Sequence, residues 1–494
     1  MLNVGITTES TPGLSSHSLR FALLLALLGQ AFVLLASFGV LNGATMAVAF
    51  GAAFALTRPR LRFSWWMLAF VPLIMLAAYP PLAFDETLYH LPYIERLART
   101  GTMGLYDDIR FGVFPLLHEL LCVPLFVAFG PTATHFIAVL QLAILGGLLV
   151  EWPDRRDAGW LAAAMVLGNP ALIGVSAVAY VETALTLFVA AGFFCLQRER
   201  RFHPFLAGFF LGTAISVKYL GILFAAAGLL YAWRSVPRYV AGVAIGATPM
   251  IARIAFLTGN PLHPFFVKSD WAVATPLADI ATQATRLLRL FYDITFDRAR
   301  AGEQPPYTLF FAIALFIAVV LARHWRLGAI CLAYLVAFVV LMPVDSRYLL
   351  PLAPLVSIPA ATYLAERLSK RTLCAIAIVA ALPLLLYPAY WIARRGWPYD
   401  VRERITALRA LERKGEGRVY VCGAEELKWF GGDELIGDHY GPYAYEKVFN
   451  GGLETLDARW FVVSKRHCRD AWRNAIAAHA ERVYEDPDAE LWRR

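Results

Sequence analysis

The chain has 494 residues, of which 59% are hydrophobic and only 17% are charged. Its mean hydropathy of +0.55 lies outside the range of an ordinary soluble domain and indicates a polytopic membrane protein. The formal net charge of +8 does not point to nucleic acid, because Lys and Arg occur in short bands between apolar runs, as membrane topology requires.

The N-terminal third of the chain begins with a polar segment, residues 1–18, which we predict to be disordered and cytoplasmic. Because about 20 apolar residues cross a bilayer, the next runs predict membrane helices at about 19–37, 40–57 and 63–80. The basic loop Arg58–Arg62 assigns the cytoplasmic side. The third helix therefore leads outward.

The first external segment, at about residues 81–112, opens with two adjacent carboxylates, Asp85 and Glu86. Carboxylates beside the hydrocarbon are costly, so this pair is a candidate for function. In a cleft at the membrane surface, one carboxylate can act as general base while its neighbour positions substrate or a metal ion. The alternative is structural, with Asp85 capping a helix and Glu86 solvated.

We expect this segment to form a short helix along the membrane interface, with Asp85 at its N-cap and Pro92 as a kink or end. Its apolar side carries Leu88, Leu91, Ile94 and Leu97. The opposite side, which we expect to face water or a substrate, carries Glu86, His90 and Tyr93. Further along, Asp107 and Asp108 form a second acidic pair, which we interpret as a solvated loop because metal binding needs more ligands.

The basic clusters in the rest of the chain fix its topology. Four of them are separated by even numbers of spans and fit the cytoplasmic side together: Arg198–Arg201, Arg234–Arg238, Arg323–Arg326 and Arg367–Arg371. This parity places on the outer side Glu182, Lys218, the loop at about 258–306, the Asp345–Arg347 turn and the chain after about 393.

One region conflicts with this topology. Residues 113–150 hold enough apolar length for two spans but must make one net crossing if Asp154–Asp157 is inside. A re-entrant or surface-lying segment resolves the conflict, and the total is then about 13 spans.

Two isolated charges within apolar runs are candidate site residues. Glu182 is the only ionisable group in the run 171–196. A carboxylate at such a position costs about 2.5–3.5 kcal/mol and should face a cavity or a partner. Lys218 is the only charged residue between positions 203 and 234, and near the outer side it can bind a phosphate. The structural alternatives are an internal hydrogen bond for Glu182 and snorkelling of Lys218 to the interface.

Two outer turns supply further candidates. In the first, Asn260 and His263 either contact a ligand or serve turn formation, which the neighbouring Gly and two Pro residues favour. In the second, Arg347 can hold a phosphate through two parallel hydrogen bonds, and Asp345 can pair with it. A purely structural Asp–Arg pair is an equally good interpretation.

The composition becomes polar and charged over residues 393–494, which indicates a separate α/β domain. A helix is predicted at Val401–Arg413, and strands are predicted at Arg418–Cys422, Arg459–Val463 and Arg482–Tyr484. Cys422 and Cys468 lie in this domain and are able to pair if it is in an oxidising compartment. Their spacing alone does not decide whether they do.

The order of these features resembles the GT-C fold, and within it glycosyltransferase family 39 and the aminoarabinose-transferase-like membrane enzymes. The resemblance spans most of residues 63–392, within a transmembrane part that we place at 19–392. It is carried by Asp85–Arg96, Thr100-Gly101, Asn169-Pro170, Tyr180–Glu182, Lys218-Tyr219, Gly259–Pro261 and Arg347–Pro351. The expected fold is a polytopic α-helical membrane protein with about 13 transmembrane helices and a small C-terminal α/β extracytoplasmic domain.

The resemblance implies transfer of a sugar, with inversion, from a polyprenyl-phosphate carrier to a hydroxyl of a cell-envelope acceptor at the cytoplasmic (inner) membrane. By position, Asp85 is then the base, Glu86 supports it and Glu182 is a second acidic group. Lys218 and Arg347 balance the charge of the departing lipid phosphate. The candidates for substrate contact are Tyr89, His90, Asn260 and His263.

Two departures from the family pattern concern the donor sugar. The segment Phe111–Pro115 lacks the Lys that aminoarabinose transferases carry there, and the second acidic residue is Glu182 where Asp is frequent. No cofactor follows from the sequence, and a requirement for a divalent metal ion stays open.

Two other functions compete with glycosyl transfer. A transporter of lipid-linked saccharides would use Glu182 and Lys218 as a translocation pair, but the chain shows no related halves. A polysaccharide ligase or polymerase would centre on a large outer loop such as 258–306. No glycine-rich loop for a nucleotide phosphate occurs, so a lipid-linked donor among membrane lipids is favoured over a sugar nucleotide.

Overall fold

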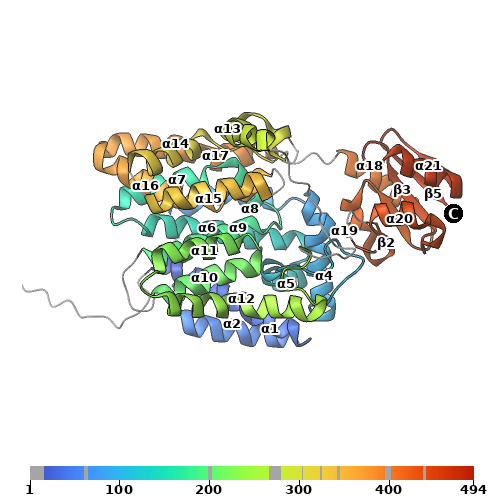
Figure 1. Ribbon diagram of the computed structural model, residues 1–494, viewed down its shortest axis with the longest axis horizontal. Helices are drawn as coiled ribbons and strands as arrows, with labels where there is room; N and C mark the ends of the chain where they lie inside the picture. The colour runs from blue at the N-terminus through green and yellow to red at the C-terminus, as the bar shows by residue number, and fades with distance from the viewer. Residues whose placement is uncertain are drawn as a thin grey trace, which may run out of the picture.

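A bundle of apolar helices with a small α/β domain at one end makes up this chain (Figure 1). The computed structural model describes residues 16–60, 65–197, 203–265, 280–302, 304–322, 325–341, 345–394, 402–437 and 441–494. The predicted disordered segment therefore lies almost wholly outside the described residues. So do the cluster Arg198–Arg201, part of Arg323–Arg326 and the middle of the loop 258–306.

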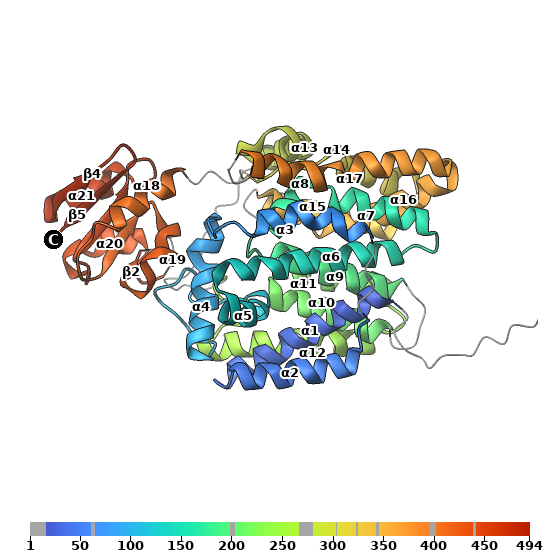
Figure 2. The same cartoon turned by 180° about the vertical axis from the view of Figure 1, so that it is seen from behind.

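The helices of the bundle follow the apolar runs of the sequence, as predicted. They are α1 His17–Ser37, α2 Gly43–Thr57, α3 Val71–Ala77, α4 Leu91–Thr100, α5 Leu117–Phe129, α6 His135–Glu151, α7 Arg156–Leu167, α8 Pro170–Ser176, α9 Glu182–Leu196, α10 His203–Val217, α11 Gly221–Ala232, α12 Val236–Thr258, α13 Ile280–Phe296, α14 Leu309–Phe316, α15 Trp325–Leu341, α16 Leu352–Arg367 and α17 Lys370–Ala393. Figure 2 shows the long helices α1, α6, α12 and α17 running along one common direction.

Membrane crossing is judged from length and composition. In the described part of the chain, four helices are long and apolar enough to cross a bilayer: α1, the segment Pro131–Glu151, α12 and α17. The pair α7 and α8, bent by 70°, is a broken span or a re-entrant loop, and the described residues also contain shorter apolar helices of 10–17 residues. The total of about 13 spans stays a prediction.

The outer surface of the bundle is apolar. Large side chains such as Val48, Leu56 and Phe256 expose 73%, 76% and 79% of their surface. A soluble monomer rarely leaves contiguous apolar surface of this kind open to water. The bundle is therefore that of a multi-pass membrane protein whose outer side chains face lipid.

The region of conflicting topology, 113–150, forms two helices of unequal length. Helix α5 has 13 residues and α6 has 17, and Gly130 with a positive φ of 85° separates α5 from the turn that leads into α6. A helix of 13 residues rises only about 20 Å, short of the roughly 30 Å of hydrocarbon. This arrangement agrees with one net crossing by α6.

Helices α10 and α12 pack through glycines. A Cβ atom on Gly208 would lie 2.0 Å from the carbonyl oxygen of Tyr239, and one on Gly246 would lie 2.4 Å from that of Phe209. Only glycine allows the two backbones to approach this closely, as in many membrane helix pairs. The rigid pair holds the C-terminal end of α10, where Lys218 follows.

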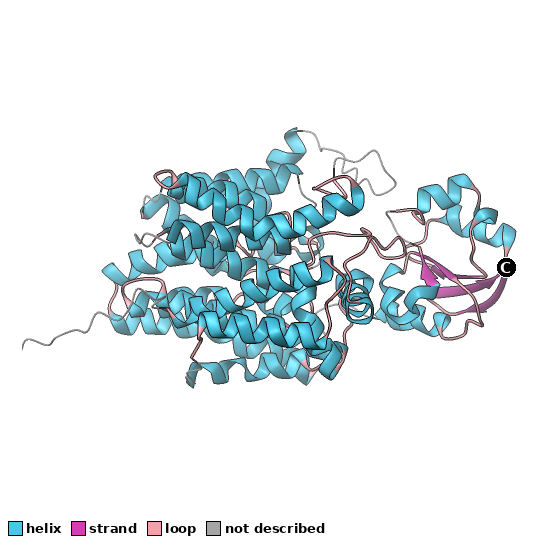
Figure 3. Ribbon diagram, turned by 90° about the horizontal axis from the view of Figure 1, so that it is seen from below, coloured by secondary structure: helices cyan, strands magenta, loops and turns pink. Residues whose placement is uncertain are grey.

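The C-terminal domain contains a mixed five-stranded sheet (Figure 3). Its strands are β1 Val419–Cys422, β2 Leu435–Ile436, β3 Trp460–Ser464, β4 Glu481–Glu485 and β5 Ala489–Arg493, in the order β2-β1-β3-β5-β4. Strand β1 is parallel to β2 and β3, and β5 is antiparallel to β3 and β4. The helices are α18 Arg402–Leu411, α19 Lys428–Gly431, α20 Tyr445–Gly451 and α21 Asp470–His479.

The predicted α/β domain is thus present, and the three predicted strands correspond to β1, β3 and β4. The structure adds β2 and β5, which sequence reasoning missed. Cys422 and Cys468, which the spacing left undecided, are joined by a disulfide bond across 46 residues.

Ion pairs fasten the domain to the bundle. The Lys428 ammonium lies 2.9 Å from Asp108 Oδ2, which also accepts from Arg96 at 2.8 Å. Asp433 is held by Arg96 at 2.6 Å and by Arg99 at 2.7 Å. We call these five residues the domain latch. The expectation that Asp108 is solvated was wrong, because its side chain is 15% exposed between two cations.

Candidate active site

The segment that follows α3 is a buried helix rather than a surface helix. A short π-helical turn, η2 Glu86–His90, runs directly into α4. The turn fits Pro92, which has no N–H to continue the α-helical pattern, and π-turns often mark functional sites. Both predicted sides are covered, since Glu86, Leu88, His90 and Leu91 are all at most 2% exposed.

The predicted N-cap position of Asp85 is found at η2, but the side chain does not act as a cap, because it makes no capping hydrogen bond. Its carboxylate instead forms an ion pair with Arg347, at 2.5 Å between Oδ2 and Nη2. A guanidinium competes better for a carboxylate than a backbone N–H does, because both groups are charged.

Arg347 is the centre of a cluster of charges. Besides Asp85, its Nε lies 2.7 Å from Asp345 Oδ2 and 3.6 Å from Glu182 Oε1. Glu182 Oε1 also accepts a hydrogen bond from the Lys218 ammonium at 2.7 Å. We call these five residues the charge cluster. The structure therefore brings together Asp85, Glu182, Lys218 and Arg347, which are the predicted catalytic and phosphate-binding residues apart from Glu86.

Local structure positions each cation. Arg347 lies in the 3-10 turn η6 Ser346–Leu349, where the Asp345 side chain accepts from the Arg347 backbone N–H at 3.2 Å. The Arg347 guanidinium lies 5.0 Å from the Tyr180 ring centroid, and the Lys218 ammonium 4.1 Å from that of Tyr348. Aromatic faces of this kind attract cations and fix their direction.

The two aspartates next to Arg347 differ in their acidity. Burial on its own would raise the pKa of Asp85, but the charge of Arg347 outweighs it and holds this pKa well below its usual range. Burial raises the pKa of Asp345 to about 6, and Arg347 offsets this only in part. Asp85 is therefore ionised at neutral pH, while Asp345 is close to titrating.

Glu86 has a different environment from its neighbour Asp85. It is fully buried and accepts hydrogen bonds from the backbone N–H groups of Ala83 at 3.2 Å and Ala179 at 2.9 Å. Its Oε1 also lies 2.6 Å from His135 Nε2. These three hydrogen bonds connect the carboxylate to the loop before η2, to the segment before α9 and to the start of α6. These contacts hold the backbone directly beside Asp85 in place.

His90 and Tyr89, predicted to contact substrate, lie in η2, the turn that follows Asp85. His90 Nδ1 is 2.6 Å from Glu119 Oε1, and both side chains are buried. Tyr89 is 9% exposed and packs edge-on against Phe111 and Phe114 at 5.4 Å between ring centroids. Their contact with a substrate stays a prediction.

Sequence reasoning missed Glu119 and His135 as partners of the η2 segment. Both are polar residues within apolar helices, the same signal that singled out Glu182. That signal shows that such a residue needs a partner but does not identify it.

The first of the two predicted outer turns, which contains Asn260 and His263, is occupied by its own hydrogen bonds. Asn260 accepts from the Leu262 N–H at 3.0 Å and donates to the Phe265 carbonyl at 2.7 Å, so its side chain serves the turn. His263 is 3% exposed, and its Nε2 lies 3.2 Å from the Phe111 carbonyl oxygen. Neither residue belongs to the charge cluster, and their contact with substrate stays a prediction.

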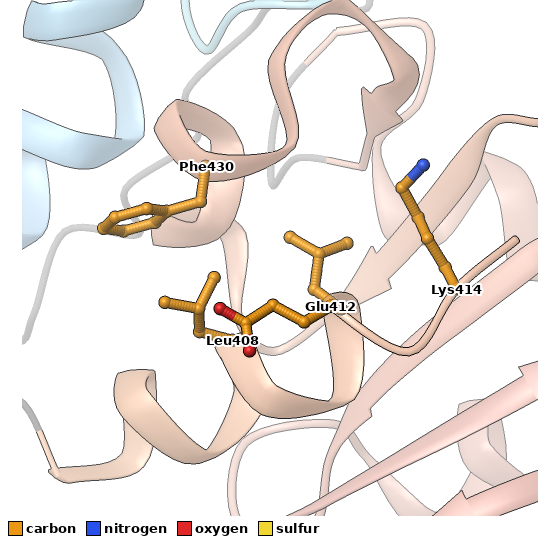
Figure 4. Close-up of a pocket in the computed structure, with 5 residues that line it drawn as sticks. Leu408, Glu412, Lys414 and Phe430 are labelled. Carbon is orange, nitrogen blue, oxygen red and sulfur yellow. The ribbon is translucent and has the colours of Figure 1, made fainter. Parts of the chain in front are cut away.

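A separate hollow lies in the C-terminal domain. It has a volume of about 370 Å³ and is lined by Leu408, Leu411, Glu412, Lys414 and Phe430. Figure 4 shows Phe430 on one side of it and Leu408 and Glu412 on the other. It contains no residue of the charge cluster. Within the described ranges, no three His, Cys, Asp or Glu side chains are grouped so as to hold a metal ion.

The fold and the cluster define the class of this chain: a multi-pass membrane protein with a GT-C-like helical bundle, a buried charge cluster and a C-terminal α/β domain. The profile of the family described as "Dolichyl-phosphate-mannose-protein mannosyltransferase" matches residues 125–266. No curated protein matches the chain in a sequence comparison.

Two crystal structures of ArnT from Cupriavidus metallidurans have a similar fold. The structure bound to undecaprenyl phosphate gives a TM-score of 0.55 at 15% identity, over 86% of this chain and 96% of that one. The apo structure gives 0.55 at 16% identity, over 91% and 98%. The predicted GT-C fold is therefore confirmed, and the resemblance to both enzyme groups named from the sequence agrees with these matches.

Proposed function

We propose that this protein is an inverting glycosyltransferase that moves a sugar from a polyprenyl-phosphate carrier to a hydroxyl of a cell-envelope acceptor. The observation that carries the proposal is the charge cluster, in which a buried carboxylate, Asp85, lies in direct contact with a cation in a lipid-facing bundle. The matching family profile and the fold shared with a structure that binds undecaprenyl phosphate support a lipid-linked donor.

In the proposed reaction, Asp85 accepts the proton of the acceptor hydroxyl. The acceptor oxygen then attacks the anomeric carbon from the face opposite the phosphate. The bond between that carbon and the phosphate oxygen breaks, and the phosphate departs with the electron pair. Arg347 and Lys218 stabilise the negative charge that develops on it, which is where fixed cations contribute most.

The pairing of Asp85 with Arg347 links donor binding to catalysis. A carboxylate whose pKa is held low by a guanidinium is a weak base. A donor phosphate that draws Arg347 towards itself weakens this ion pair and raises the basicity of Asp85. The base therefore becomes strong only when the donor is in place.

We place the site and the C-terminal domain on the outer face of the cytoplasmic membrane. The disulfide between Cys422 and Cys468 supports this side, because such bonds persist in oxidising compartments. The basic clusters of the sequence are separated by even numbers of predicted spans, and this gives the same orientation.

The test measures release of polyprenyl phosphate from polyprenyl-phosphate sugars by the purified protein, in the presence of cell-envelope lipids and glycans as acceptors, with Asp85→Asn beside wild type. Wild type should release the lipid phosphate, and the variant should lose most of this activity. Asp457→Asn is the matched control, since this side chain is 93% exposed. Equal release by Asp85→Asn would eliminate Asp85 as the base, and lipid movement across vesicles without release would favour a transporter.

A further inference from the structure

Three carboxylates share one guanidinium in the charge cluster. Asp85, Asp345 and Glu182 all lie within 3.6 Å of Arg347 nitrogen atoms. Lys218 is in contact with Glu182 alone among them. When all five residues of the charge cluster are ionised, they therefore carry three negative and two positive charges. Arg110, in the loop before α5, adds positive potential at Asp85.

Binding of the donor makes this imbalance larger, if the proposed function holds. The phosphate of a polyprenyl-phosphate sugar is a diester with one negative charge, and the proposed site places it at Arg347 and Lys218. A further anion among three buried carboxylates is repelled, and such repulsion raises the pKa of the weakest acid. One carboxylate must therefore become neutral for tight binding.

Asp345 accepts from the Arg347 backbone N–H at 3.2 Å, yet it is the carboxylate whose charged form the surrounding groups favour least. Glu182 keeps Lys218 as a partner of its own, and Asp85 has the shortest contact with Arg347. Asp345 faces Arg347 within its own turn, and Glu182, Lys218 and Asp85 from other elements. Tyr307, which precedes α14, also lies near it. Burial has already brought the pKa of Asp345 to about 6.

We propose that Asp345 takes up one proton from water when the donor phosphate binds at Arg347 and Lys218. Neutral Asp345 then releases the Arg347 Nε to the phosphate, while the turn η6 keeps the guanidinium in place. Asp345 is thus a positioning residue that acts through Arg347. It couples donor affinity to pH.

The direction of the pH effect follows from linkage. Above the pKa of free Asp345 the protein must first bind a proton, so affinity falls as pH rises. The dissociation constant should increase by up to about tenfold per pH unit above about pH 6. Below that pH, Asp345 is already neutral, and affinity should be nearly constant.

The experiment uses the full-length protein and a short-chain prenyl methyl phosphodiester, whose charge does not change in this pH range. Calorimetry in two buffers of different ionisation enthalpy at about pH 7.5 measures proton uptake, and titrations from about pH 5.5 to about 8.5 give the dissociation constants. Wild type should take up close to one proton per ligand. Asp345→Asn should take up none and bind with constant affinity.

Asp345→Glu, which keeps the carboxyl group, and Asp457→Asn, a distant exposed control, should both behave like wild type. Proton uptake that persists in Asp345→Asn would assign the proton to another group and overturn the proposal. Binding by wild type without proton uptake would overturn it as well, and would leave the proposed function intact. Failure of wild type to bind the phosphodiester at any pH would overturn both.

Discussion

The charge cluster and the domain latch are both networks of five charged residues, but only one of them is complete. In the latch, the Lys428 ammonium donates to Asp108 and to the carbonyls of Gly432 and Leu435, at 2.8–2.9 Å. In the cluster, Glu182 Oε2 is buried with no hydrogen-bond partner among the described residues, and Lys218 is 27% exposed. A network that satisfies its own groups holds structure, whereas one with unused groups has capacity for a ligand.

The two networks also differ in charge. The latch contains three cations and two carboxylates, and the cluster contains two cations and three carboxylates. Burial lowers the pKa of Lys428, and the nearby Asp108 opposes this shift in part. An excess of carboxylates around Arg347 is instead a reason for that site to bind protons or exchange partners.

The largest expected effect comes from the cluster. Asp85→Asn should reduce the rate of lipid-phosphate release by about 10²–10⁴-fold, the range for loss of a positioned base. The thermal unfolding midpoint should fall only modestly, because Asp345 and Glu182 still pair with Arg347. Glu86→Gln should lower the midpoint further and the rate of release less, since Glu86 accepts hydrogen bonds from two backbone N–H groups. An equal decrease of the unfolding midpoint in the two variants would contradict the different roles assigned to Asp85 and Glu86.

The next effect comes from the latch. Lys428→Met leaves two carbonyls without this donor and leaves Asp108 with Arg96 alone, and should lower the free energy of unfolding by about 1–3 kcal/mol. The rate of release should change less than in Asp85→Asn. Denaturant titration of the purified protein measures the loss. Lys414→Met is the matched control, because its partner Glu434 is 56% exposed and the pair should contribute under about 1 kcal/mol. A control loss as large as that of Lys428→Met would remove the distinction.

A smaller effect is expected at Lys218, the more exposed of the two cations in the charge cluster. Lys218→Met should weaken binding of a prenyl phosphodiester by about tenfold, about 1.4 kcal/mol, because one of two phosphate-binding cations is lost. Calorimetric titration near neutral pH gives the dissociation constant. An unchanged constant would show that Lys218 serves Glu182 alone.

The smallest effect is expected at the rim of the latch. Arg99 and Asp433 are 56% and 57% exposed, so their ion pair is screened by water. Arg99→Met should change the free energy of unfolding by about 0–1 kcal/mol. A loss as large as that of Lys428→Met would mean that the latch acts as one unit, with no weaker rim.

Much of the architecture follows from the sequence, because membrane helices need long apolar runs and strands need short ones. Strand β2 has only two residues, and β5 mixes Glu490 and Arg493 with apolar residues, so neither gives a clear pattern. The prediction that Asp108 is solvated was wrong, because its partner Lys428 is 320 positions away in the sequence.

The candidate site was predictable to the extent that isolated charges in apolar runs need partners. That argument selected Glu182 and Lys218, the outer turn supplied Arg347, and the structure places all three together. It did not separate Asp85 from Glu86, because neighbouring residues point in different directions and their partners come from remote helices. Only the ion pair to Arg347 and the contact with His135 distinguish these two carboxylates.

The central claim is that the charge cluster receives the phosphate of a lipid-linked sugar. The most direct measurement is an experimental structure of the protein in lipid nanodiscs with polyprenyl phosphate bound. The predicted result is phosphate density in contact with Arg347 and Lys218, with Asp85 facing the space where the sugar would lie. Phosphate density at the domain latch or elsewhere, with every ion pair of the charge cluster unchanged, would contradict the account.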